Sequence, residues 1–119
     1  MQFTILCYET AADFAKRNSA EAPVYWGAWS AYGATLAQAG VLVSGAGLLA
    51  PDMASTVRLR ADRRDVQDGP YAETREQLGG FYIIDCAGMD EAVAWAKRCP
   101  AAQWGPIEVR AMRAGFAAQ

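Results

Sequence analysis

The stretch Phe3-Thr-Ile-Leu-Cys-Tyr8 decides the fold, because it has the period of a strand and carries apolar side chains on both faces. One face carries Phe3, Ile5 and Cys7. The opposite face carries Thr4, Leu6 and Tyr8. A strand that is mostly apolar on both sides is typical of the centre of a sheet, so we expect this segment to be a central strand.

Two helices are predicted from apolar residues at helical spacing. The first has Pro23 in its first turn, where a missing N–H costs nothing, and ends at Gly40. Its inner face is expected to carry Tyr25, Trp29, Tyr32 and Leu36. The second follows Gly88 as N-cap and ends at Pro100. Its inner face is expected to carry Met89, Val93, Ala96 and Cys99.

The remaining strands are predicted from alternation and turn residues. They are Val41–Val43, which is interrupted at Ser44, a hairpin from Thr56 to Gln67, Gly80–Cys86 and Ile107–Met112. In the hairpin we expect Val57 and Leu59 to point inward, and Arg58 and Arg60 to point outward. The segment with Asp13, Lys16 and Arg17 is predicted as a loop. The whole order predicts a single α+β domain, residues 1–119, with a ferredoxin-like βαββαβ sandwich.

This sandwich leaves one face of its sheet uncovered, because both helices pack on the other face. Residues 3–8 and 81–84 nevertheless offer apolar side chains on both faces. A second copy of the chain is the simplest cover for such a surface. We therefore expect a homodimer packed sheet on sheet, with a cleft where sheet, loops and partner meet.

Composition excludes several classes of function. The 119 residues include 11 Lys and Arg, 13 Asp and Glu, and no His. The near-neutral balance argues against nucleic acid as a direct partner. The lack of His excludes Ser-His-Asp and Cys-His catalysis and His-ligated metals. No apolar run is long enough for a membrane span, and no basic segment opens the chain as in a signal peptide. The three cysteines are an odd number, which argues for free thiols. We therefore expect a cytoplasmic protein without membrane, metal or cofactor, whose cysteines are buried as small apolar side chains.

The stretch Asp68-Gly-Pro-Tyr-Ala-Glu-Thr-Arg-Glu-Gln-Leu-Gly-Gly80 is the candidate site for chemistry, because it gathers charges between two strands. Asp68 and Glu73 are candidate catalytic acids or bases. Asp68 is equally explained as a turn residue that caps backbone N–H groups, and Glu73 as a residue at a helix start or a partner of Arg75. Residues 70–77 have room for only one or two helical turns. Gly79 and Gly80 would let the backbone approach another group closely.

Four further side chains are candidates for substrate binding. Arg58 and Arg75 could grip a carboxylate or phosphate, although a solvated strand face and an ion pair explain them as well. Tyr71 could line a pocket or simply pack in the core. Ser44 opens a run of small residues whose N–H groups could lie beside the charged loop.

Three motifs together resemble the YCII-related family, in its DGPF-domain branch. They are Ser44-Gly45-x-Gly47-Leu48, Ser55–Arg58 and above all Asp68–Gly80, and the resemblance covers nearly the whole chain. Tyr71 stands where Phe is typical, and Arg75 where Lys is typical. The resemblance implies a dimeric α/β-barrel. Activity suspected in the broader family uses a His and an Asp, so only the acidic half could be present here, at Asp68 or Glu73. Some relatives look linked to alternative sigma factors.

Two functions from different classes are consistent with these observations. The first is binding of a small polar or anionic molecule in a cleft at the dimer interface, with cofactor-free acid/base chemistry by Asp68 and Glu73. The second is a non-catalytic interaction module with a transcription-related protein partner. In the second case, the charged loop only shapes the interface.

Overall fold

The structure, a computed structural model, describes residues 1–114. One antiparallel sheet has four strands in the order β2-β5-β1-β6. Its strands are β1 (Gln2–Thr10), β2 (Leu42–Gly47), β5 (Glu76–Asp85) and β6 (Ile107–Ala111). A separate two-stranded sheet consists of β3 (Ser55–Arg60) and β4 (Arg63–Asp68). The helices are α1 (Ala11–Ala15), α2 (Ala22–Gln38) and α3 (Met89–Lys97), with short 3-10 turns at Lys16–Asn18, Pro51–Met53 and Pro100–Gln103.

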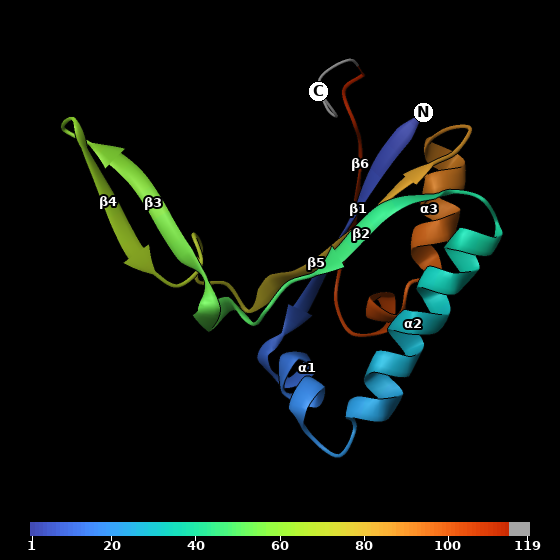
Figure 1. The fold of residues 1–119 in the computed structure, drawn as a ribbon, viewed down its shortest axis with the longest axis horizontal. Coiled ribbons are helices and arrows are strands. Elements are labelled where there is room, and N and C mark those ends of the chain that lie inside the picture. The colour runs from blue at the N-terminus through green and yellow to red at the C-terminus, as the bar shows by residue number, and fades with distance from the viewer. Residues whose placement is uncertain (115–119) are drawn as a thin grey trace.

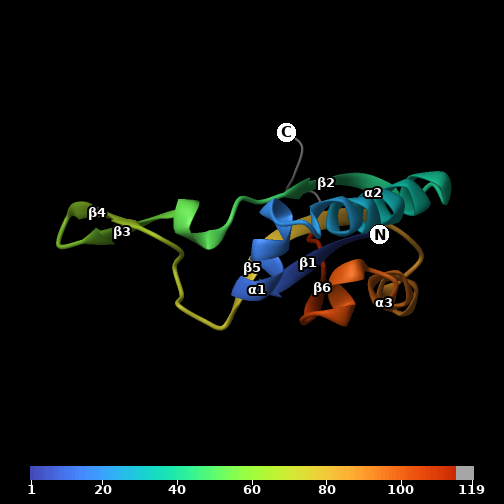
Figure 2. The ribbon, with the colours of Figure 1, turned by 90° about the horizontal axis from the view of Figure 1, so that it is seen from below.

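The four-stranded sheet and its two long helices confirm the predicted α+β class and the β-α-β-β-α-β order. β1 lies inside the sheet between β5 and β6, as its two apolar faces predict. The helical layer of the fold is seen to one side of the sheet in Figure 1, and Figure 2 shows the same elements from below. Pro23 lies in the first turn of α2, and Gly40 ends that helix with a φ of 75°.

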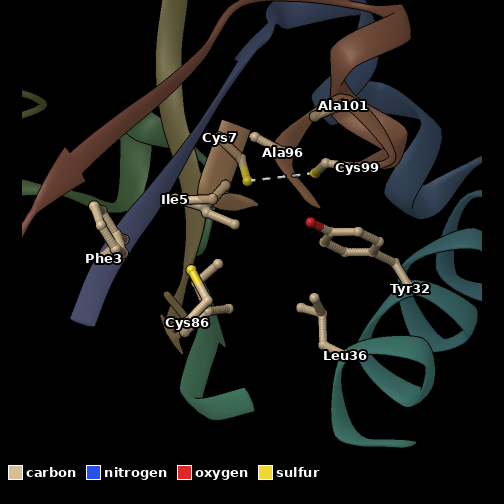
Figure 3. Close-up of a cluster of buried hydrophobic side chains, with 11 residues drawn as sticks. Phe3, Ile5, Cys7, Tyr32, Leu36, Cys86, Ala96, Cys99 and Ala101 are labelled. Carbon is tan, nitrogen blue, oxygen red and sulfur yellow. Dashed lines mark hydrogen bonds between the residues drawn. The ribbon is translucent and has the colours of Figure 1, made fainter. Parts of the chain in front are cut away.

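The hydrophobic core lies between the sheet and the two helices. Ile5 of β1 and Leu36 of α2 are completely buried, and Ala92 and Ala96 of α3 close the core. Figure 3 shows the side chains of α2 directed at those of β1. β1 alternates strictly between buried and half-buried residues, so its even-numbered side chains lie on the face that the helices leave uncovered. That face is apolar too, because Leu6 is paired with Phe81 across the strands.

The segment after β1 is helical, which corrects the predicted loop. Thr10 accepts a hydrogen bond from the Asp13 backbone N–H, and the Asp13 carboxylate accepts one from the Thr10 N–H. This reciprocal capping box satisfies the free donors at the start of α1. The chain continues as a 3-10 turn through Lys16 and Arg17. The helical turns carry Arg17 back toward β1, where it takes part in the candidate site.

β3 and β4 form an arm, residues 55–68, that stands away from the main body (Figure 1). The turn between them has positive φ at both Ala61 and Asp62, which matches the twist of a tight hairpin. The hairpin is therefore confirmed, but the predicted direction of its apolar side chains is wrong. Val57 and Leu59 are 57% and 64% exposed. Alternation separates the two faces correctly, yet the arm extends beyond the main body and has no core to face.

Three local predictions also need correction. β2 continues through the glycine-rich stretch to Gly47, because an edge strand tolerates residues without side chains. In α3 the buried positions are Ala92 and Ala96, whereas Met89 and Val93 are exposed. Residues 70–75 contain no helical turn, and the chain enters β5 directly at Glu76.

Gly79 confirms that the glycine pair serves a close approach. The pairing of β1 and β5 skips one residue, since Cys7 is opposite Gly80 and Tyr8 is opposite Leu78. A Cβ atom on Gly79 would lie 2.6 Å from the Glu9 Oε1 atom and 3.2 Å from the Arg17 Nη2 atom. The bulge therefore brings the backbone of Gly79 directly against the buried ion pair of Glu9 and Arg17.

We expect Gly79→Ala to lower the free energy of unfolding by about 1–3 kcal/mol, because the held Glu9 carboxylate cannot move away from the new methyl group. Chemical denaturation measures this loss. Gly47→Ala is the matched control, since a Cβ atom there meets nothing within 4 Å. Equal stability of the two variants would show that the close approach imposes no constraint.

Candidate functional site

A carboxylate, that of Glu9, is buried near the C-terminal end of β1. Glu9 is 1% exposed and follows the buried side chains of the same strand face. Both of its carboxylate oxygens accept from the Tyr25 hydroxyl at 2.8 Å, and Oε1 also accepts from Arg17 Nη2 at 3.2 Å. The charge is thus compensated by a cation and by a phenolic donor, as a buried ion requires.

Arg17 ties this cluster to the neighbouring strands. Its Nη2 group also donates to the Gly79 carbonyl at 3.1 Å, and its Nη1 group donates to the Leu48 carbonyl. Its Nε group donates to the Tyr25 hydroxyl at 3.2 Å. The guanidinium carbon lies 4.7 Å from the centre of the Phe14 ring, within cation–π range. The Arg17 side chain is only 10% exposed, so these contacts fix its position.

A cavity of about 260 Å³ lies beside the cluster, between α2 and the β2–β5 side of the sheet. Four aromatic residues of the helix-covered face contribute to its lining: Tyr25, Trp26, Trp29 and Tyr82. Phe81 also borders it, although the Phe81 side chain lies on the other face of the sheet, opposite Leu6. Backbone of the glycine stretches in β2 and β5 forms the rest of the wall, together with Leu42, Ala46 and Arg17. Arg17 is the one charged residue among the described residues that line it. An apolar cavity with a few polar groups is the usual form of a small-molecule site.

The aromatic wall is held by ring contacts. Trp29 stacks on Tyr82 with ring centres 6.1 Å apart and planes at 20°. Behind it, Trp104 stacks on Tyr25 at 5.4 Å, and the Lys16 ammonium lies 4.7 Å from the centre of the Trp104 ring. Stacked and edge-to-face pairs of this kind stabilise one arrangement of the rings. Trp104 therefore supports the cavity wall from outside.

Two tyrosines of the cavity keep their protons at neutral pH. Burial, followed by the hydrogen bond to Glu9, raises the pKa of Tyr25 to about 12. Burial also raises the pKa of Tyr82 to about 12. A third polar group, the Trp29 Nε1–H, is shielded from solvent and has no hydrogen-bond partner within residues 1–114. All three residues line the cavity, but the Tyr25 hydroxyl is bound to Glu9 and the Trp29 Nε1–H is closed to solvent.

The cysteines are part of the core. Cys7, Cys86 and Cys99 are all free and buried, as predicted. The Cys7 and Cys99 sulfur atoms lie 3.8 Å apart (Figure 3). Their hydrogen bond, together with burial, raises the pKa of the Cys7 thiol, so this thiol is uncharged.

The residues predicted as a site from sequence lie elsewhere. Arg58 and Tyr71 are brought together, with the guanidinium carbon 5.1 Å from the ring centre, although Tyr71 is 77% exposed. The other four are exposed: Ser44, Asp68, Glu73 and Arg75. All six lie within the described residues, and none of them lines the cavity. Their catalytic and binding roles stay predictions.

Backbone contacts hold the turn after Asp68. Gly69 has a φ of 101°, its N–H donates to the Ala54 carbonyl at 2.6 Å, and its carbonyl accepts from the Thr56 hydroxyl at 2.9 Å. The loop beyond it is fastened by Gln77, whose amide donates to the Ala72 carbonyl at 2.7 Å. These contacts connect the base of the arm to the sheet.

Sequence reasoning missed the residues of the cavity as a site. Glu9 continues the buried period of β1, and this pattern was the available signal, because a carboxylate on a core face requires a cation. The prediction of Tyr25 as a core residue is confirmed, since it is 2% exposed, whereas Trp29 is only half-buried and packs against the core. Within residues 1–114, no three His, Cys, Asp or Glu side chains group so that they could hold a metal ion. Within the same range, no helix is long and apolar enough to cross a membrane.

The fold and the cavity define a small α+β sandwich protein with an aromatic site beneath its first long helix. The family model of the YCII-related domain matches residues 1–114. The chain therefore belongs to the YCII-related family, which confirms the resemblance drawn from its motifs.

Two further similarities extend this assignment. An uncharacterised protein of Rhizobium meliloti (strain 1021) is 38% identical over 97 residues, which are 82% of this chain and 78% of that protein. The solved structure of 5-chloro-2-hydroxyhydroquinone dehydrochlorinase from Burkholderia phenoliruptrix AC1100, in complex with 2,5-dihydroxybenzoquinone, is similar with a TM-score of 0.57. The match covers 97% of this chain and 96% of that one at 17% identity, so it shows a shared fold.

The raised pKa of Tyr25 predicts a loss of stability in alkali. A phenol that is harder to ionise in the folded chain stabilises the fold below its unfolded pKa near 10, and this contribution is lost as the pH rises toward 12. Over that interval, the free energy of unfolding of the Tyr25→Phe variant should fall by about 2–3 kcal/mol less than that of the wild type. Urea denaturation at pH 8 and in steps above pH 10 measures both slopes. Tyr71→Phe, which removes an exposed hydroxyl, is the control. Parallel curves for wild type and Tyr25→Phe would contradict the prediction.

Proposed function

We propose that this protein binds a small planar aromatic molecule in the cavity between α2 and the sheet. The observation that carries the proposal is the aromatic wall beside the buried Arg17 guanidinium. A volume of about 260 Å³ suits a ligand of one substituted ring. The rings of the wall offer stacking surface, and Arg17 gives the cavity one polar end.

The structural neighbour supports the ligand class. That enzyme is described in complex with 2,5-dihydroxybenzoquinone, a planar ring that carries oxygen substituents. Both chains share the fold over nearly their whole length. The cavity in this protein is lined mainly by aromatic residues and glycine, with Arg17 as its charged residue, which suits a planar ring with polar substituents.

Acid/base chemistry by Asp68 and Glu73 is a separate part of the proposal. Both carboxylates are exposed in a single chain, so a second copy would have to cover them before burial could raise their proton affinity. A catalytic role for either therefore depends on the homodimer.

The open face of the sheet supports a homodimer. Leu6, Phe81 and Ile83 lie on the face opposite the helices, by the register of β1 and β5. We propose that two copies pack these faces together as a dimeric α/β-barrel. Burial of two such apolar surfaces provides the driving force, at about 25 cal/mol per Å² removed from water.

The alternative is an interaction module with a transcription-related protein as partner. The arm favours it, because Val66 is 66% exposed opposite the exposed Val57, and the outward arginines lie on the other face. A protein whose only role is to contact a partner needs no ligand in the cavity. Ligand binding therefore discriminates between the two functions.

We expect Gly47→Leu to abolish binding of small phenols while leaving the fold intact. Gly47 lines the cavity, and a Cβ atom on it meets nothing within 4 Å, so the new side chain fills the space of the ligand. Quenching of tryptophan fluorescence and thermal shift report binding. At 100 times its Kd, a ligand stabilises the wild type by about 2.7 kcal/mol.

Two controls sharpen this experiment. Gly27→Leu adds the same side chain to the exposed side of α2 and should bind as the wild type does. The Asp68→Asn variant should also bind small phenols as the wild type does, because Asp68 lies outside the cavity. Loss of binding in this variant would instead place the site at the charged loop. A flat response of the wild type to every aromatic compound would favour the interaction module.

We expect Leu6→Glu to convert the dimer to a monomer, because the new charge would be buried between the two sheets. Sedimentation velocity over a range of concentrations measures the mass. Val93→Glu places the same charge on the exposed side of α3 and should leave the mass unchanged. A wild-type chain that sediments as a monomer throughout would overturn the dimer.

A further inference from the structure

The arm formed by β3 and β4 has one apolar face and one charged face. Val57 is opposite Val66 in the hairpin, so both lie on one face, and Leu59, two residues further along β3, lies on the same face. These three side chains are 57%, 66% and 64% exposed. The other face carries charged residues, such as Arg58 opposite Asp65. A two-stranded hairpin is only marginally stable in water, so its apolar face needs a surface to pack against.

The main body of the same chain does not cover this face. Among the described residues, β3 and β4 pair only with each other, and the arm stands clear of the body in Figures 1 and 2. The radius of gyration is 15.9 Å, larger than the value of about 13.5 Å for a compact chain of this length. Hydrogen bonds from Gly69 to Ala54 and from Thr56 to Gly69 fasten the arm at its base.

An apolar hollow of about 340 Å³ lies at the base of the arm. Its lining comes from residues 48–54 on one side and from Pro70, Gln77 and Leu78 on the other. Gln77 is the one polar residue among the described residues that line it. Leu78 is opposite Tyr8 in the sheet and therefore lies on the open face, so the hollow is continuous with the surface proposed as the dimer interface.

The arm and the hollow each have one charge without a partner. Arg64 is opposite Leu59, on the apolar face of the arm. Asp52 lies between two residues that line the hollow. Both side chains are exposed, and neither takes part in an ion pair within residues 1–114. The apolar face of the arm thus carries an unpaired cation, and the rim of the hollow carries an unpaired carboxylate.

We propose that the arm of one copy packs into the hollow of a second copy, with Val57 and Val66 on the apolar lining and Arg64 beside Asp52 of the second copy. This inference rests on the homodimer of the proposed function and adds a contact to it. In a two-fold dimer each arm meets the hollow of the other chain, so one symmetric exchange covers both surfaces. The matching charges and the continuity with the open sheet face favour a second copy over an unrelated protein.

The first experiment compares neighbouring positions on the two faces of β4. Val66→Asp should raise the dissociation constant of the dimer by about tenfold or more, because the new carboxylate would be buried in an apolar hollow. Gln67→Asp places the same charge on the opposite face and should change that constant by no more than about threefold. Sedimentation velocity over a range of concentrations measures both constants. Equal effects of the two variants would overturn the exchange.

The second experiment tests whether the contact joins two chains. Homodimers of Arg64→Glu would bring two carboxylates together at each contact, and homodimers of Asp52→Arg would bring two cations together. In a mixed dimer of these variants, each contact again joins opposite charges. Mixed dimers should therefore form in clear excess over the two homodimers, as measured by native mass spectrometry. A statistical mixture would overturn the proposal.

The matched control for the mixing experiment is Arg63→Glu. Arg63 lies on the other face of the arm, opposite Arg60. This variant mixed with Asp52→Arg should give a statistical distribution, and the same excess of mixed dimers as with Arg64→Glu would overturn the pairing of Arg64 with Asp52.

The wild type and Leu6→Glu separate the two levels of the argument. A wild-type chain that is monomeric throughout would overturn the homodimer and the exchange together. A wild-type dimer that Leu6→Glu dissociates, but that Val66→Asp and Gln67→Asp affect equally, would overturn the exchange alone.

Discussion

The ion pair between Glu9 and Arg17 is the constraint on which the rest of the structure depends. A carboxylate that leaves water is tolerated only where a cation and hydrogen-bond donors replace its hydration. Arg17 supplies the cation, and it also binds the carbonyls of Leu48 and Gly79. Because Tyr25 joins from α2, one guanidinium fixes where β1, the end of β2, the bulge of β5 and the first long helix meet.

The ion pair matters more for positioning the elements around it than for the stability of the fold. Apolar side chains of equal volume often stabilise a core as well as a buried ion pair does. An apolar replacement would leave no charge at the wall of the cavity and would not hold the Gly79 carbonyl. The bulge shows how far the chain adapts to the pair, since β5 leaves one residue out of register there. The polar end of an otherwise aromatic cavity follows directly from that adaptation.

Much of this fold could be predicted from local patterns. The alternation in β1, the stripe of α2 and the glycine at its end all predict what the structure has. The same alternation places Glu9 on the buried face, but no periodicity connects it with Arg17, because their contact is tertiary. The capping box of Thr10 and Asp13 was the local signal for the helical turn that carries Arg17 back to β1.

The site was harder to predict because its residues have the pattern of a core. Tyr32 and Leu36 are buried on α2, whereas Trp29 on the same stripe is left half-buried at the wall of the cavity. Sequence spacing cannot separate these cases, since the difference is whether the facing strand carries side chains or glycine. Gly47 leaves space unfilled opposite α2, because a Cβ atom there meets nothing within 4 Å, whereas the Tyr82 ring lies against Gly45 and the Glu9 carboxylate lies against Gly79. The arm shows the same limit, because alternation defines two faces without showing which one meets a core.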